Sequence, residues 1–147
     1  IPPCELNRVV NAGDHFGFPY IHGKNIPDTG YEAPKDFVFS QPVWEFQAHT
    51  APLGIKFYDG ESFPEYYKNG AFVAQHGSWN RSEKVGYRLL FMKMEEGYVV
   101  SADVFIDGWM SNETSWGRPV TPLILKDGSM LISDDQADSI IRVTYKG

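Results

Sequence analysis

The chain has 147 residues, the size of one ordinary domain, and its 42% hydrophobic and 15% aromatic content is enough to build a buried core. A formal net charge of −6 and a pI near 5.1 exclude nucleic-acid binding, which needs a basic surface, and an anionic membrane surface as partner. No apolar run approaches the roughly 20 residues of a membrane-spanning helix.

The start of the chain, Ile1-Pro2-Pro3-Cys4, has no Met, so we expect a chain that was processed, cleaved or cut from something longer. Cys4 is the only cysteine, so it is free or its partner lies on other sequence. Two glycosylation sequons, Asn80-Arg81-Ser82 and Asn112-Glu113-Thr114, would matter only in a secreted eukaryotic protein.

Strand signals dominate the chain, and helical spacing is nearly absent among 14 Gly and 10 Pro. The first 50 residues hold scattered strand material, Glu5–Val10 and Val43–Ala48, around a Gly/Pro-rich stretch. Four strands are then predicted, the first closing at the turn pair Asp59-Gly60 and the last at Asp107-Gly108. They are Leu53–Tyr58, Ala71–Gln75, Tyr87–Met94 and Tyr98–Ile106.

The pattern restarts near the C-terminus as a three-stranded meander. Val120–Leu125 and Met130–Ser133 flank the turn pair Asp127-Gly128, and Ser139–Tyr145 follows the polar loop Asp134–Asp138. Short, regularly spaced strands with Asp-Gly turns indicate an all-β fold that is a propeller, a sandwich or a barrel.

Blade length favours a propeller. Residues 51–108 match one full blade of ~40–50 residues, residues 117–147 supply three strands of a last blade, and residues 1–50 form the outer part of an earlier blade plus a long loop. The chain would be about two and a half to three blades, against the ~4–8 of a closed propeller. Unpaired sheet edges would therefore have to be covered.

The richest candidate segment runs from Phe72 to Ser82. An apolar strand breaks there into a loop that holds His76, Trp79, Asn80 and Arg81. Loops on a rigid scaffold often hold function, so these side chains are candidates for a binding site. The alternative is a solvated turn with a capping Trp.

At this point the chain resembles the C-terminal part of the sorbosone dehydrogenase-like branch of the soluble, pyrroloquinoline quinone (PQQ)-dependent sugar dehydrogenases, which include glucose and aldose dehydrogenases. The resemblance covers nearly the whole chain in the family's order. The matching segments are Pro2–Val9, His15-Phe16-Gly17-Phe18-Pro19-Tyr20, Ala48–Gly54, Ala74–Ser82, Gly86-Tyr87, Gly117-Arg118-Pro119-Val120, Asp127-Gly128-Ser129 and Ser133–Ala137.

The resemblance implies a six-bladed β-propeller of which this chain is a part. It implies PQQ and calcium in a central funnel, a small sugar or aldehyde substrate, and a periplasmic or extracellular location. A family His takes the substrate's hydroxyl proton as hydride passes to the quinone. That His and the calcium ligands are expected outside this chain, on the missing N-terminal part of the propeller, which would be a partner and possibly a separate chain. No catalytic residue is therefore assigned here.

The resemblance also implies roles for particular residues. Arg118 matches the arginine that holds a PQQ carboxylate, although the second arginine of the glucose dehydrogenases is replaced by Val120. Those enzymes present a Lys where this chain has the longer Gln75–Ser82 loop, so His76 or Arg81 would supply charge to the cofactor. The alternative for Arg118 is a surface ion pair.

Further positions have a structural and a functional interpretation. Trp79 would stack on a quinone or sugar, or cover the blade core, and His49 would point into the funnel or be structural. Asp134 and Asp135 form a turn after a strand, where backbone capping is more common than catalysis. His15 and His22 lack neighbours with zinc-ligand spacing.

Two other functions stay open. A non-catalytic propeller fragment would act as a binding or assembly module in a larger complex. Val120 in place of a second arginine and the missing half of the propeller favour this interpretation over an enzyme. A stand-alone small β-domain is the third reading, and the unclosed last blade speaks against it. The sequence before Ile1 would discriminate between enzyme and module.

Overall fold

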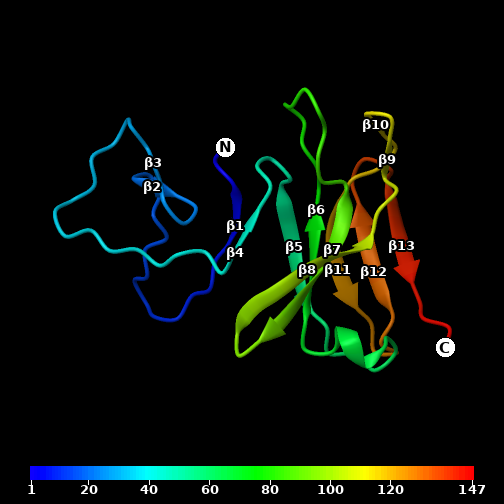
Figure 1. Ribbon diagram of the computed structural model, residues 1–147. Helices are drawn as coiled ribbons and strands as arrows, with labels where there is room; N and C mark the ends of the chain where they lie inside the picture. Colours follow the sequence, from blue (N-terminus) through cyan, green and yellow to red (C-terminus); the bar gives the residue numbers. More distant parts are fainter. The chain divides into compact units, whose positions relative to one another are not determined.

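The computed structural model describes residues 1–147, which form two compact units, residues 1–48 and 49–147 (Figure 1). The fold is all-β, with one short 3-10 helix, η1 (Glu65–Tyr67), and several small sheets, none of which closes into a barrel. No helix that could span a bilayer is present. The all-β prediction is confirmed, and the architecture is consistent with part of a propeller-like fold.

The first unit consists of two small antiparallel pairs joined by irregular segments. β1 (Cys4–Leu6) pairs with β4 (Trp44–Phe46), and β2 (Ile21–His22) pairs with β3 (Ile26–Pro27). The strand material predicted near residues 5–10 and 43–48 is therefore present but shorter, with three residues in each strand.

Carboxylates hold the loops of this first unit. Glu5 and Glu45 face each other across β1 and β4 and accept the backbone N–H groups of Gly23 and Lys24, with N···O distances of 2.5 Å and 2.8 Å. These bonds satisfy backbone donors that have no ladder partner in so irregular a segment.

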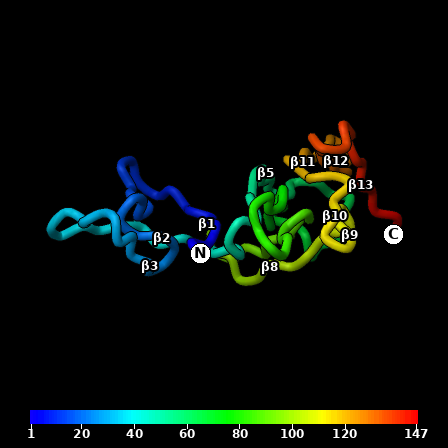
Figure 2. The backbone as a smooth tube through the Cα atoms, turned by 90° about the horizontal axis from the view of Figure 1, so that it is seen from above, coloured from blue at the N-terminus to red at the C-terminus, as the bar shows by residue number.

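The second unit is built from two antiparallel sheets that share one core. The first sheet is a meander in the order β5-β6-β7-β8, and the second runs β11-β12-β13 (Figures 1 and 2). The strands are β5 (Pro52–Phe57), β6 (Ala71–Gln75), β7 (Arg88–Glu95), β8 (Tyr98–Ile106), β11 (Pro119–Ile124), β12 (Met130–Asp134) and β13 (Ser139–Val143), with a hairpin of β9 (Met110–Ser111) and β10 (Thr114–Ser115) between the sheets in sequence.

The core lies between the two sheets. Phe72 on β6 and Phe91 on β7 pack in one cluster with Met130 and Ile132 on β12, and all four are almost fully buried. The innermost strands come very close, since a Cβ on Gly54 of β5 would lie 2.4 Å from the Oγ1 of Thr121 on β11. Only glycine fits there, so this residue sets how closely the sheets approach.

Both sheets also carry apolar residues on the face turned away from this core. On β5, Leu53, Ile55 and Phe57 alternate with less exposed positions. In the second sheet, Leu123 lies opposite Leu131, while Ile140 on β13 is 69% exposed. The second unit therefore has two outer apolar faces, Leu53/Ile55/Phe57 and Leu123/Leu131/Ile140. All of these residues are exposed except Leu131, which is half-buried.

Candidate functional site

Several loops of the second unit meet at one end of the two sheets. β6 and β12 end there, while β5, β7, β11 and β13 begin there, because neighbouring strands are antiparallel. We call the segments 49–51, 76–87, 116–118 and 135–138 the loop end. The predicted cofactor- and substrate-binding residues, His49, His76, Trp79, Arg81 and Arg118, all belong to it.

The 76–87 loop has a rigid base. The N–H groups of His76 and Gly77 donate to the carbonyls of Ala51 and Thr50, both at 3.0 Å. The hydroxyl of Tyr87 donates to the carbonyl of Ser78, and the Ser78 N–H donates to Val85 at 2.9 Å. Gly77 has a φ of +99°, and a Cβ there would lie 2.5 Å from the Tyr87 ring, so this crossing requires glycine.

Arg118 holds the same loop from the second sheet. Its Nε donates to the carbonyl of His76 at 3.1 Å, and its Nη2 donates to the carbonyl of Gly77. The guanidinium also lies over the Tyr87 ring, 5.6 Å from the centroid. A guanidinium has five N–H donors, and these bonds use the edge formed by Nε and Nη2. The terminal edge, Nη1 and Nη2, keeps donors for a further acceptor.

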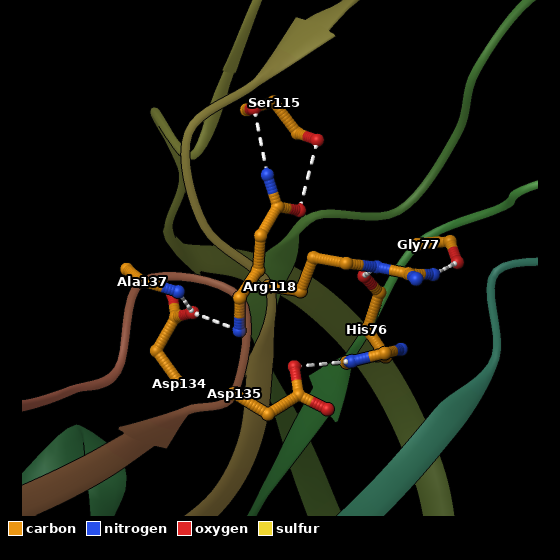
Figure 3. A network of polar contacts seen from close by, with 8 residues as sticks. His76, Gly77, Ser115, Arg118, Asp134, Asp135 and Ala137 are labelled. Atoms are coloured by element: carbon orange, nitrogen blue, oxygen red, sulfur yellow. Dashed lines mark hydrogen bonds and ion pairs between the residues drawn. The ribbon is translucent and has the colours of Figure 1, made fainter.

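His76 and Asp135 form a second link between the sheets. The His76 Nε2 lies 2.8 Å from the Asp135 Oδ1, and the His76 side chain keeps 15% of its surface exposed (Figure 3). The hydrogen bond from His76 lowers the pKa of the Asp135 carboxyl below its ordinary value, and the charge of His76 acts in the same direction.

The two neighbouring aspartates act differently. Asp134 is buried and its Oδ1 accepts the N–H groups of Gln136 and Ala137 at 3.1 Å and 2.8 Å, while its Oδ2 has no partner (Figure 3). The expected backbone cap is therefore confirmed for Asp134. The Asp135 side chain in addition extends to His76 on the neighbouring sheet.

Trp79 and Arg81 lie at the tip of the 76–87 loop. Trp79 is 83% exposed, and the Arg81 Nε donates to the Glu83 carbonyl at 3.0 Å. The tip is tethered to the β9–β10 hairpin, since Lys84 donates from its backbone N–H and its Nζ to Glu113 at 2.8 Å and 2.7 Å. Trp79 covers no core, which leaves its aromatic surface available to a ligand.

His49 is exposed and lies directly before Thr50 and Ala51, whose carbonyls hold the base of the 76–87 loop. Its backbone has a φ of +69°. The structure thus joins His76 to both Arg118 and Asp135, and the Tyr87 ring lies beneath the Arg118 guanidinium. Trp79, Arg81 and His49 lie on the surrounding loops. Sequence reasoning missed Tyr87 and the pairing of Asp135 with His76.

The other histidines have structural contacts. The His15 Nδ1 accepts the Gly17 N–H at 2.9 Å, and the His22 Nε2 lies 3.0 Å from the Asp28 Oδ2. No group of three or more His, Cys, Asp or Glu side chains that could hold a metal ion occurs in residues 1–147.

A family model described as TrAA12-like matches residues 11–146. The chain belongs to the TrAA12-like family. An uncharacterized protein of Borreliella burgdorferi is 42% identical to this TrAA12-like chain over an alignment of 151 positions that covers 99% of the chain and 40% of that protein.

Solved structures share the fold of this TrAA12-like chain at low identity. A calcium structure of Trichoderma reesei carbohydrate-active enzymes family AA12 has a TM-score of 0.78 at 21% identity, over 97% of this chain and 42% of that one. A glucose dehydrogenase has a TM-score of 0.72 at 20% identity, over 99% and 38%. The holo form of a pyranose dehydrogenase PQQ domain from Coprinopsis cinerea has a TM-score of 0.54 at 17% identity, over 96% and 48%.

The chain therefore spans about two fifths of the length of the curated relative and less than half of these solved structures. At the level of fold and family, the comparisons fit the predicted resemblance to PQQ-dependent sugar dehydrogenases. The sorbosone dehydrogenase-like branch remains a prediction.

Proposed function

We propose that this chain is the C-terminal part of a PQQ-dependent sugar or aldehyde dehydrogenase and contributes part of the cofactor funnel. The observation that supports this most is Arg118, a cation fixed at the loop end of a TrAA12-like chain with its terminal edge unused by the loop. A neighbour that shares the fold is a holo PQQ domain.

The residues present fit an anionic, planar cofactor. The terminal edge of Arg118 suits a carboxylate, because two parallel N–H donors match its two oxygens. Trp79 offers an exposed aromatic face for stacking, and Arg81 adds a cation on the loop that also holds His76. When bound, PQQ would supply the two-electron oxidant for a sugar hydroxyl or an aldehyde.

The remaining parts of the site would come from other sequence. Calcium ligands and the proton-accepting His are proposed to lie outside residues 1–147, and the small sugar or aldehyde would bind near Trp79 and His49. A periplasmic or extracellular location is part of the same proposal.

The partner would be the rest of the propeller. Its need is supported by the two outer faces, because clusters of exposed apolar residues such as Leu53/Ile55/Phe57 and Leu123/Ile140 mark surfaces that are normally covered. The unpaired edge of β13 supports it too, since the first sheet has four strands and the second has three. On this proposal, residues 51–108 are one blade and residues 117–147 most of the last.

A second candidate is a non-catalytic module that kept the fold. It is favoured by the bonds from Arg118 to backbone carbonyls, which are structural in themselves, and by Val120 in place of a second arginine. Such a module would bind or assemble with partners without oxidising a sugar.

The test is reconstitution. The complete protein, this chain together with the rest of the propeller, is freed of cofactor with EDTA, incubated with PQQ and CaCl2 and assayed for dye reduction with D-glucose and other aldoses. The enzyme proposal predicts sugar-dependent dye reduction that requires PQQ. PQQ binding without turnover would favour the module, and no binding would refute both the enzyme and its cofactor. Native mass spectrometry of the same sample shows whether a second polypeptide completes the ring.

A further inference from the structure

The link between His76 and Asp135 has a consequence for the chemistry of the imidazole. A carboxylate accepts hydrogen bonds and does not donate them, so the proton shared at 2.8 Å belongs to the His76 Nε2. In neutral His76 the other nitrogen, Nδ1, then has no proton and can only accept.

We propose that Asp135 is a positioning residue that fixes the ring proton of His76 on Nε2 and thereby holds Nδ1 as an acceptor for a hydroxyl group of the ligand. This inference rests on the proposed function for the identity of the ligand, a sugar, but not for the tautomer. It differs from the expectation that His76 supplies charge to the cofactor.

Three observations indicate that the fold holds the side chains of His76 and Asp135 in this geometry. The imidazole is mostly buried yet 15% exposed, so it is held while a ligand can reach it. Its own carbonyl is fixed by Arg118 and its N–H by Ala51, so the backbone that presents the ring cannot turn easily. The loop that presents Asp135 is fixed by the hydrogen bonds that the backbone N–H groups of Gln136 and Ala137 donate to the Asp134 carboxylate. In Figure 3 the second ring nitrogen of His76 points away from Asp135.

The tautomer can be measured directly. The protein is labelled with 15N-histidine, His76 is assigned with the His76→Gln variant, and the two ring nitrogens are distinguished by long-range proton–nitrogen correlation. We expect wild-type His76 to be protonated on Nε2. In Asp135→Asn, whose amide can either donate or accept, the Nδ1–H form should become populated, and Asp135→Ala should show the same loss. Asp138→Asn is the matched control, because it removes one negative charge from the same loop and should leave the tautomer unchanged.

An unchanged tautomer in both Asp135 variants, or an equal change in Asp138→Asn, would overturn the positioning role. The variants are first compared by circular dichroism, and Asp135→Glu, which keeps a carboxylate, should restore the wild-type tautomer in part.

Addition of D-glucose to the complete protein, this chain together with the rest of the propeller, loaded with PQQ and calcium, tests the acceptor role. The His76 Nδ1 resonance should shift in the wild type and shift at least several-fold less in Asp135→Asn at the same sugar concentration. If the tautomer depends on Asp135 but the sugar shifts no His76 resonance, the acceptor role fails while the positioning role stands. If PQQ does not bind at all, the proposed function fails separately.

Discussion

Gly77 and Tyr87 touch at the base of the 76–87 loop, and the lack of a side chain at Gly77 decides where that loop runs. The sequence marked the loop as a candidate site, but its contacts join residues far apart in the chain. Arg118 reaches His76 across 42 positions and Asp135 reaches it across 59. Local spacing encodes neither contact, because both depend on how β6, β11 and β12 are placed side by side.

Replacing Gly77 by alanine should destabilise the chain and displace the loop. The φ of +99° is unfavourable for alanine, at about 1–3 kcal/mol, and the new Cβ would meet the Tyr87 ring at 2.5 Å. Gly108→Ala is the control, since its φ is +104° and its Cβ would meet nothing within 4 Å. In urea unfolding, the free energy of unfolding of Gly77→Ala should be lower than that of Gly108→Ala by at least about 1 kcal/mol. Equal losses would mean that the Tyr87 contact is unimportant.

The stability of the chain should fall in acid. The pKa values of Asp14, Asp28, Asp127 and Asp135 lie below the ordinary 3.8, chiefly because hydrogen bonds from Asn11, His22, Ser129 and His76, respectively, favour their charged forms. A lowered pKa means that the folded chain binds fewer protons than the unfolded chain, so this stability is present above pH 3.8 and is lost as pH falls below it.

Urea midpoints measured from about pH 6 down to about pH 2.5 should therefore decrease, most steeply below about pH 4. Asp135→Asn should flatten part of that decrease, while Asp138→Asn should follow the wild type. A midpoint that stays constant or rises through this range would contradict the assignment of these bonds.

At the scale of elements, the sequence predicted much of the fold correctly. β6 and β8 have the predicted bounds, and β5, β7, β11, β12 and β13 differ from them by one or two residues. Alternation and Asp-Gly turns suffice there because each strand is five residues or longer. The hairpins β2–β3 and β9–β10 and the helix η1 were not predicted, since two or three residues are too few to show a period.

The two faces of the second sheet should respond differently to the same substitution. Ile132 on β12 is fully buried, whereas Ile140 on β13 is 69% exposed. In the 147-residue chain, Ile132→Val should lower the unfolding free energy by about 0.5–1.5 kcal/mol, and Ile140→Val should change it by less than about 0.5 kcal/mol. Chemical denaturation measures both, and equal costs would place the core elsewhere.

At the scale of the whole molecule, whether the outer faces are covered in the longer protein distinguishes a piece of a propeller from an independent domain. Leu123 is half exposed in this chain. If further blades cover it in the longer protein, Leu123→Asn should lower the stability of that protein by about 2 kcal/mol or more while changing the 147-residue chain little. Thermal and urea unfolding of both lengths measure the difference. An equally small effect in both would show that this face stays uncovered.

The central claim concerns the cofactor, and isothermal titration with PQQ of the calcium-loaded complete protein, this chain together with the rest of the propeller, tests it most directly. We predict saturable binding that Arg118→Gln weakens at least about tenfold, corresponding to about 1.4 kcal/mol. Trp79→Ala, at an exposed position that the fold does not need, should weaken it independently. Arg142→Gln is the matched control, because Arg142 pairs with Asp127 on the surface. Absence of PQQ binding, or equal losses in Arg118→Gln and Arg142→Gln with Trp79→Ala unchanged, would contradict a cofactor site at the loop end.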